Sequence, residues 1–499
     1  MSKKRVIVIG SGFGGLAVAA RLAATGYEVS VFEKLDAPGG RAYTFKIGDF
    51  YFDGGPTVIT APPIFDEIFE LAAKNRQDYV EFIPVNPYYR IFKYDKNYLD
   101  YNGDVNFVLK QIEKFNEKDK QGYIKLLELV YPMFKKGFFE LSIKPFNSFI
   151  DMLSIVPDLV RFGAYRSVYK FVSSLIQDDF LRRCFSFHPL LVGGNPFRAS
   201  CIYSLIHSLE REWGVFYPKG GIKSLVNAFV KFIEELGGTF YFNSEVEEII
   251  IENKIAKGIR LKNSKTFYAD YIVCNSDAPY TYMKLINPKY RSFRNSDIRY
   301  KYFTKYSMSL VVIYFAVNKV YKDAQFVHHN IILTKRYKDL IYDIFDGKEL
   351  PEDFSLYVHR PVYTDPSVCK EGYETFYVLS PVPNLRANID WEKERTRYRD
   401  KILGFLEDNF LPDLRASIVA IDMIDPLYFR DKLNTYLGSG FSIEPNLFQA
   451  AYFRPHNLSE DIKNLYFVGA GTHPGAGVPG VLSSAKIVHQ LIQKQSRNF

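Results

Sequence analysis

The glycine pattern Gly10-x-Gly12-x-x-Gly15, close to the amino terminus, constrains the fold more than any other feature of this chain. It is preceded at residues 5–9 by Arg-Val-Ile-Val-Ile, a β-branched run typical of a buried parallel strand. It is followed at residues 13–25 by a segment rich in Ala and Leu, which favours a helix. Glycines at this spacing between a strand and a helix predict a tight turn that a phosphate-bearing ligand can approach closely.

Each of these glycines has a separate task in such a turn. Gly10 allows the turn itself, Gly12 lets a pyrophosphate approach the backbone, and Gly15 lets the helix pack closely on the strand. The free N–H groups and positive dipole at the helix start favour phosphate there. A second strand, predicted at residues 28–33, ends in Glu33, about 20 residues further on, where a ribose-binding carboxylate is expected. Such a carboxylate would repel a 2′-phosphate, which disfavours NADP.

A second glycine-rich entrance to a helix lies at the far end of the chain. A strand predicted at residues 464–468 is followed by a Gly/Pro-rich loop at 469–480 and a helix at 481–494. Arg41 follows two glycines shortly after the second strand and can lie beside the same ligand. Two entrances at opposite ends of the chain suit a flavin dinucleotide held along its whole length, so FAD is favoured over NAD.

Composition and charge exclude several other classes of protein. Lys plus Arg number 64 and Asp plus Glu 56, a net charge of +8, and no basic run contains interleaved aromatic residues, so nucleic acid is not an expected partner. No apolar run approaches the roughly 20 residues of a membrane-spanning helix. The four cysteines include no CxxC pair. His328 and His329 are adjacent, and neighbouring residues of a strand point to opposite faces, so no metal site is expected.

The remaining patterns predict an α/β protein with several layers. Residues 88–110 alternate in strand fashion, and helical patterns dominate from about 113 to 215. Strand-like runs recur through residues 300–385. Further helices are expected at 63–76, 225–237 and 392–408, and further strands at 239–243, 246–252, 257–261 and 270–274.

Four segments resemble bacterial-type phytoene desaturases, members of the carotenoid/retinoid oxidoreductase family in the flavin amine oxidase superfamily. They begin at Phe52, Phe185, Glu210 and Gly469 and read FDGGPTVIT, FSFHPLLVGGNP, EREWGV and GAGTHPGAGVPG. The likeness extends from about residue 5 to 490, and its last segment is the most specific. The resemblance implies noncovalent FAD, a long acyclic carotene as substrate, and action at a membrane surface.

The resemblance also implies the domain organisation. We expect a Rossmann-like FAD-binding domain of the glutathione-reductase-2 type, a mixed-sheet substrate-binding domain and a helical, membrane-associating subdomain. The expected ranges are 1–75, 220–290 and 455–499 for the discontinuous FAD-binding domain, 76–112 and 291–454 for the substrate-binding domain, and 113–219 for the helical subdomain.

The cofactor contacts of the family carry over position by position. The glycine turn is expected at the pyrophosphate, Glu33 at the ribose, and Arg41 near the flavin. Val246 matches the position whose backbone meets the adenine, and the loop at 469–480 lines the flavin end. The expected cofactor-binding residues are Gly10, Gly12, Gly14, Gly15, Glu33, Gly40, Arg41, Val246, Gly469, Gly471 and Val478.

The implied reaction is FAD-dependent desaturation of 15-cis-phytoene by hydride transfer to flavin, in several steps to all-trans-lycopene, with oxygen or quinone as final electron acceptor. The protein has to orient the C–H bond and exclude water. Asp151 is a candidate catalytic residue, with an ordinary helix cap as the alternative. His473 and Arg41 are further candidates, although a structural hydrogen bond suits His473 as well, and Arg41 is chiefly a flavin-site residue.

The segment at residues 129–176 combines many aromatic residues with Lys and Arg, which suits a peripheral position at a membrane surface. A helical cap whose aromatics fill its own core is the alternative. We expect the protein in the cytoplasm, at the inner face of the cell membrane. Two other functions suit this kind of fold: a prenyl-lipid carrier, which generally lacks an intact dinucleotide site, and a diapophytoene desaturase or other flavin oxidase.

Overall fold

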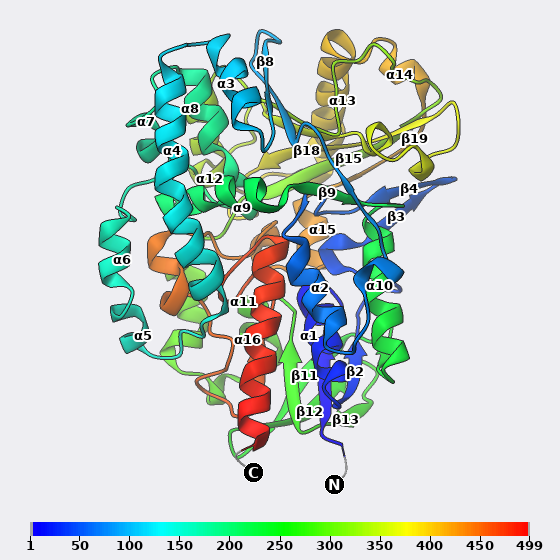
Figure 1. Cartoon of the computed structure of the whole chain (residues 1–499). Coiled ribbons are helices and arrows are strands. Elements are labelled where there is room, and N and C mark those ends of the chain that lie inside the picture. The colour runs from blue at the N-terminus through cyan, green and yellow to red at the C-terminus, as the bar shows by residue number, and fades with distance from the viewer. Residues whose placement is uncertain (1–2, 498–499) are drawn as a thin grey trace.

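The two glycine-rich segments from opposite ends of the chain meet on one parallel sheet. The computed structural model of the chain describes residues 3–497. Five parallel strands form this sheet, at the end of the molecule where both termini lie (Figure 1). In spatial order they are β10 (Thr239–Tyr241), β2 (Glu28–Phe32), β1 (Arg5–Ile9), β14 (Tyr271–Cys274) and β20 (Leu465–Phe467).

The predicted βαβ unit at the amino terminus is confirmed. In β1 every residue except Arg5 is buried, and β14 is buried throughout, as expected for strands covered on both faces. The helix α1 (Phe13–Ala24) contacts both α16 (Val478–Arg497) and α10 (Ile222–Glu235). Gly26 follows α1 with a φ of +93°, the left-handed conformation that glycine adopts without steric cost. The first and last helices therefore pack side by side over the same sheet.

A mixed seven-stranded sheet forms the other half of the molecule, drawn in the upper part of Figure 1. Its pairs are antiparallel except for one parallel pair, β16 with β7. All nine residues of its strand β15 are buried. In spatial order the strands are β19 (Ile418–Ile424), β15 (Ser309–Val317), β18 (Glu374–Val382), β17 (Leu356–His359), β16 (His329–Ile332), β7 (Tyr89–Phe92) and β8 (Tyr98–Tyr101).

A group of helices covers one side of this sheet, at the left of Figure 1. Apolar side chains of α4 and α8 share one core with β7 and β8, and α9 (Leu205–Trp213) packs on α4. The predicted helical region after residue 113 is thus confirmed. Its other helices are α3 (Val105–Glu113), α4 (Asp119–Phe134), α5 (Phe149–Leu153), α6 (Val156–Arg161), α7 (Val168–Ser173) and α8 (Asp179–Ser186).

Smaller sheets and helices complete the fold. An antiparallel meander of β11 (Val246–Glu252), β12 (Ile255–Leu261) and β13 (Thr266–Tyr268) leads from β10 to β14. Two small sheets pair β3 with β4, and β9 with both β5 and β6. The remaining bounds are β3 (Thr44–Ile47), β4 (Phe50–Asp53), β5 (Ile59–Thr60), β6 (Phe82–Pro84), β9 (Val215–Pro218), α2 (Pro62–Glu70), α11 (Ala278–Tyr280), α12 (Tyr337–Asp346), α13 (Trp391–Asn409), α14 (Leu414–Ser417) and α15 (Pro426–Asp431).

Two predicted elements are wrong in part. The strand-like stretch at 88–110 ends in a helix, because the Asp104 side chain caps α3 by accepting hydrogen bonds from the N–H groups of Asn106 and Phe107. The helix expected at 63–76 ends at Glu70, and Ala73 beyond it has a left-handed φ of +53°. The fold class, an α/β protein with a Rossmann-like sheet and a mixed second sheet, is confirmed.

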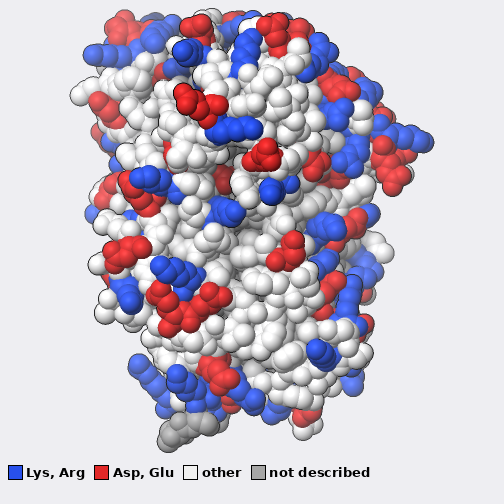
Figure 2. Space-filling model, turned by 90° about the vertical axis from the view of Figure 1, so that its right-hand side faces the viewer, with Lys and Arg blue, Asp and Glu red and all other residues white. Residues whose placement is uncertain are grey.

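The surface gives two further facts. No helix within residues 3–497 is both long enough and apolar enough to cross a membrane. On the face that carries α10 and α13, at the right of Figure 1, basic and acidic side chains are interspersed (Figure 2).

Candidate functional site

A single continuous cavity joins the glycine turn to the seven-stranded sheet. Its volume is about 620 Å³ and its walls are mostly apolar. At one end it is lined by the loop after β1, by the end of β2 and by the loop at 469–480, and at the other by side chains of β15, β17 and β18 and by α9. Large apolar cavities with a few convergent polar groups are the usual binding sites of ligands and cofactors.

Most of the sequence-predicted cofactor residues lie on the wall of this cavity. Gly15 and Gly471 do not line it, although each is next to residues of the same loops that do. The predicted residues that line the cavity are Gly10, Gly12, Gly14, Glu33, Gly40, Arg41, Val246, Gly469 and Val478.

Gly12, Gly14 and Gly15 of the glycine turn are closely packed. A Cβ on Gly15 would lie 2.0 Å from the carbonyl oxygen of Gly10. A Cβ on Gly12 or Gly14 would meet the side chain of Asn275, at 2.8 and 2.5 Å respectively. Sequence reasoning missed Asn275, although its position directly after β14, at the carboxyl end of a parallel strand, is where ligand-facing residues are expected.

Glu33 connects the end of β2 to the glycine turn. Its carboxylate is buried, and Oε2 accepts hydrogen bonds from the backbone N of Ser11 at 2.8 Å and from its Oγ at 2.6 Å. The other oxygen, Oε1, accepts from the backbone N of Leu35 at 2.9 Å. Each carboxylate oxygen has further lone pairs. Glu33 is therefore fixed in place while it can still accept hydrogen bonds from a ribose.

Arg41 brings positive charge to the cavity wall. Its Nε donates to the carbonyl oxygen of Gly440 at 2.8 Å, and its Nη2 is buried without a partner among residues 3–497. Burial lowers the pKa of Arg41, and the charge of Asp277 opposes that effect. Asp277 accepts from the backbone N of Tyr436 at 3.0 Å and from the hydroxyl of Ser442. An unpaired guanidinium nitrogen beside a glycine turn fits an anionic dinucleotide such as FAD.

The carboxyl-terminal loop is held from behind by Arg454. This fully buried side chain donates to the carbonyl oxygens of Thr472 at 3.1 Å, Ala470 at 2.7 Å and Ile443 at 3.0 Å. Nothing local in the sequence distinguishes Arg454 as the residue that shapes this loop.

His473 lies in the same loop but faces away from the cavity. Its Nε2 lies 3.0 Å from the carbonyl oxygen of Leu141, and its ring packs against Phe146. Burial is the main cause that lowers the pKa of His473 to about 4. The imidazole therefore stays neutral near pH 7 and joins the loop to the helical region.

Asp151 lies outside the cavity wall, on α5. The Ser148 backbone N donates to its Oδ2 at 3.0 Å, and the Asp151 backbone N donates to the Ser148 Oγ at 3.3 Å, which together form a capping box. Slight burial raises the pKa of Asp151, but the hydrogen bonds from Ser148 and the charge of Lys144 outweigh this and lower it below 3.8. The structure thus gives Asp151 a helix-capping contact.

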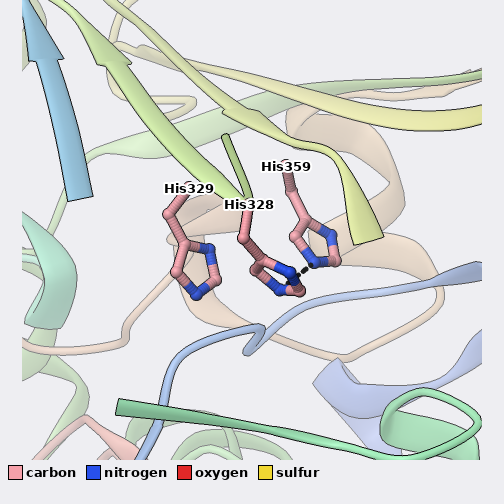
Figure 3. Close-up of side chains that lie close together, drawn as sticks. All are labelled: His328, His329 and His359. Carbon is pink, nitrogen blue, oxygen red and sulfur yellow. Dashed lines mark hydrogen bonds between the residues drawn. The ribbon is translucent and has the colours of Figure 1, made fainter. Parts of the chain in front are cut away.

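Three buried histidines meet behind the cavity wall (Figure 3). The expectation that His328 and His329 point apart is wrong, because β16 begins only at His329 and their rings lie 4.4 Å apart. The Nε2 atoms of His328 and His359 are 3.1 Å apart and share one hydrogen bond. His329 reaches the hydroxyl of Tyr357, which lines the cavity, at 2.7 Å. Burial lowers the pKa of His328 to about 3, so this cluster is neutral near pH 7.

Comparison with known proteins identifies the family. The profile of the family described as flavin containing amine oxidoreductase matches residues 13–349. A lycopene-forming phytoene desaturase of Pseudescherichia vulneris is 46% identical over 98% of this chain and 99% of its own length. The chain belongs to the phytoene desaturase family. This family lies within the flavin-containing amine oxidoreductases, as the glycine turn, Glu33 and the carboxyl-terminal loop indicate.

Two further comparisons concern a less similar relative and a solved structure. The 4,4'-diapophytoene desaturase (4,4'-diaponeurosporene-forming) of Staphylococcus haemolyticus is 34% identical over 98% of both chains. The crystal structure of an oxidoreductase from Methanosarcina mazei superimposes with a TM-score of 0.66 at 21% identity, over 97% of this chain and 100% of the other. The latter supports the fold alone. The family resemblance seen in the four segments is confirmed.

Proposed function

We propose that this chain is an FAD-dependent phytoene desaturase that converts 15-cis-phytoene in several steps to all-trans-lycopene. One observation carries the proposal: the cavity that begins at a dinucleotide-binding turn continues without a break into a mostly apolar chamber. A carotene has no polar handle, so its recognition depends on buried apolar area, worth about 25 cal/mol per Å². The similarity to a lycopene-forming relative supports lycopene as the product.

The proposed FAD contacts follow the placement of the predicted residues. The N–H groups of the glycine turn and the start of α1 face the pyrophosphate, and Glu33 accepts from the ribose hydroxyls. The unpaired Nη2 of Arg41 supplies a charged donor near the flavin. Val246 borders the adenine, and Gly469 and Val478 border the flavin ring. When bound, FAD supplies the two-electron acceptor for the removal of hydrogen from a C–C bond.

The chain's own residues bind, orient and exclude water. Apolar side chains of the seven-stranded sheet, such as Leu310, Val312 and Leu379, line the chamber and hold the polyene by contact area. His473 and Arg454 act on the flavin loop from behind by fixing its backbone. Among the candidate catalytic residues, Arg41 borders the cavity, whereas His473 and Asp151 have positioning and capping contacts.

The substrate is proposed to enter from a lipid surface. Gly137, Phe138 and Leu141 line the cavity, and the chain then continues directly into α5 and α6 at the left edge of Figure 1. Six apolar or aromatic side chains of this segment, here called the α5–α6 patch, are exposed to solvent, which is typical of a surface that meets another apolar phase. They are Phe149, Ile150, Leu153, Val156, Val160 and Tyr165.

The direct experiment supplies phytoene in liposomes to the FAD-loaded protein and identifies the pigments by chromatography. Lycopene as the main product is the expected result, with oxygen or a quinone as the final electron acceptor. Colourless extracts, with a flavin that stays oxidised under anaerobic conditions, would refute the proposal. The same assay with 4,4'-diapophytoene tests the shorter substrate, and purified protein without bound flavin would favour a prenyl-lipid carrier instead.

A further inference from the structure

We propose that Glu210 is the proton acceptor of the reaction, a role that rests on the proposed desaturase function. Glu210 lies on α9 and lines the cavity on its apolar side, where the carotene is expected. Its Oε2 is buried and has no hydrogen-bond partner among residues 3–497. This unpaired oxygen belongs to a side chain in the wall of a mostly apolar chamber, from which it would take a proton from a carbon skeleton.

The other carboxylates on the cavity wall are already engaged. Glu33 accepts three hydrogen bonds at the nucleotide end. Glu245 pairs with Lys262 at 2.7 Å and with Lys34 at 3.6 Å. Asp277 uses both oxygens, on Ser442 and Tyr436.

Of the carboxylates that the described residues place on the wall, Glu210 thus has the free oxygen on the substrate side.

Neighbouring side chains hold Glu210 in one orientation. The hydroxyl of Tyr89 donates to its Oε1 at 2.6 Å, and Tyr89 itself lines the cavity. The Nε2 of His188 lies 3.4 Å from Oε2 but makes no hydrogen bond with it. His207, one turn earlier on α9, is bonded to Tyr101 at 3.0 Å and to the carbonyl oxygen of Phe185 at 2.9 Å. Oε1 is therefore anchored while Oε2 stays free.

The protonation of Glu210 suits a base that works near neutral pH. Burial raises its pKa to about 7, and the hydrogen bond from Tyr89 and the electrostatic interaction with His207 oppose that rise. Burial lowers the pKa of both His188 and His207 to about 3, so neither carries charge near pH 7. A base is most effective when its pKa lies close to the working pH. The titratable groups that surround it are Tyr88, Tyr89, Tyr101, Tyr123, His188, His207 and Arg211.

Each desaturation removes one hydride and one proton from two neighbouring carbons. One C–H bond breaks with its electron pair, and the hydride passes to oxidised flavin. A C–H bond on the neighbouring carbon breaks, its electron pair forms the new C=C bond, and its proton passes to Oε2 of Glu210. The carboxylic acid later returns its proton to bulk water, and the reduced flavin is reoxidised by oxygen or quinone.

The test follows flavin bleaching in single turnover, with FAD-loaded protein mixed anaerobically with phytoene liposomes. Glu210→Gln is isosteric and keeps an acceptor for Tyr89, so its FAD content is expected to match the wild type. Its bleaching rate should fall by about 100-fold or more, the usual contribution of a general base. Glu212→Gln on the exposed side of the same helix is the matched control, with bleaching at the wild-type rate.

Two readouts separate a proton acceptor from a merely structural carboxylate. The wild-type bleaching rate should fall as pH drops below about 7, because the base must be ionised, and this limb should disappear in Glu210→Gln. Tyr89→Phe removes the hydrogen bond that lowers the pKa of Glu210, so it should move the limb to higher pH. Infrared difference spectra should contain a carboxylic-acid C=O band that titrates over the same range and is absent from Glu210→Gln.

The outcomes are distinguishable. A Glu210→Gln enzyme that bleaches as fast as the wild type, or an unchanged pH limb in it, overturns the role of Glu210 and leaves the proposed function intact. A wild-type protein whose flavin is never bleached by phytoene overturns the proposed function together with the role of Glu210.

Discussion

Glu33 and Ser11 are joined by two hydrogen bonds to a single carboxylate oxygen, from the Ser11 backbone N at 2.8 Å and from its Oγ at 2.6 Å. The carboxylate thus fastens the end of β2 to the turn that follows β1, in a place sealed from solvent. Hydrogen bonds to a buried charge contribute more to stability than those between neutral groups, about 1.5–3 kcal/mol each.

Replacing Ser11 by Ala should therefore lower the free energy of unfolding by about 1.5–3 kcal/mol.

Glu33→Gln should in addition weaken FAD binding, by at least about tenfold in Kd, because a neutral amide is a poorer acceptor for ribose hydroxyls. Denaturant unfolding and flavin titration measure the two effects. Ser292→Ala, an exposed serine whose side chain makes no cap hydrogen bond, is the control. Unchanged FAD affinity in Glu33→Gln would contradict the ribose contact.

Gly15→Ala is expected to abolish FAD retention or folding. The added Cβ would lie 2.0 Å from the Gly10 carbonyl oxygen, far inside van der Waals contact, so α1 would have to move away from β1. The flavin-to-protein absorbance ratio after purification reports the loss. Gly404→Ala, within α13 and with no atom within 4 Å of the new Cβ, should instead stabilise the protein by about 0.5–1 kcal/mol.

Arg41→Met should reduce FAD affinity by at least about tenfold, since it keeps most of the apolar side-chain volume but removes the buried charge. The unpaired Nη2 then disappears together with the bond from Nε to Gly440. Isothermal titration of the apoprotein with FAD measures the change. Arg415→Met, an exposed arginine on α14, provides a matched substitution remote from the cavity. Equal FAD affinities of the two variants would contradict a contact between Arg41 and FAD.

Stability should fall as the solution is acidified below about pH 6.5. Seven histidines among the described residues have a pKa lowered chiefly by burial, so between their folded pKa and 6.5 the unfolded chain binds more protons. Each fully effective group costs about 1.4 kcal/mol per pH unit. The raised pKa values of Asp53, about 6, and Glu210, about 7, act in the opposite direction but are fewer.

The apparent Tm, measured by scanning calorimetry of one preparation between pH 7.5 and 5, should therefore decrease steadily. The histidines concerned are His188, His207, His328, His329, His359, His473 and His489. A Tm that stays level or rises on acidification would show that these imidazoles are protonated within the fold.

Membrane attachment should depend on the α5–α6 patch. The side chains of Ile150 and Val160 are 75% and 66% exposed, and aspartate at both positions would oppose insertion into a lipid surface. Flotation with anionic liposomes should show the double variant in the unbound fraction. Val419→Asp, a 46% exposed position on β19 in the part of the molecule away from α5 and α6, should float like the wild type. Equal flotation of all three proteins would exclude this patch as the contact.

Local patterns were sufficient to predict residues that the fold brings together on the wall of one cavity. Glu33 and the glycine turn depend on neighbours within about one βαβ unit, so their spacing carries the structural information. Arg454 and Asn275 could not be found in this way, because their partners lie on other segments that only the folded chain brings near.

The position of Glu210 could not be predicted for the same reason. Its unpaired oxygen and raised pKa result from burial beside Tyr89 of β7 and beside His188. The burial of a side chain cannot be predicted from the sequence of one helix. The expectation that His328 and His329 point to opposite faces was wrong because His328 lies before β16, which begins at His329.

One edge strand of the parallel sheet, β20, and the loop after it begin at residue 465, whereas the glycine turn lies within residues 10–15. During synthesis, β20 and the loop after it therefore emerge from the ribosome long after the glycine turn, and the two segments can meet only then. Fragments that stop short of α16 would carry the glycine turn but leave one side of α1 bare of its helical neighbour. Flavin uptake should thus require residues 465–497, and fragments that lack them should be exposed to quality-control proteases.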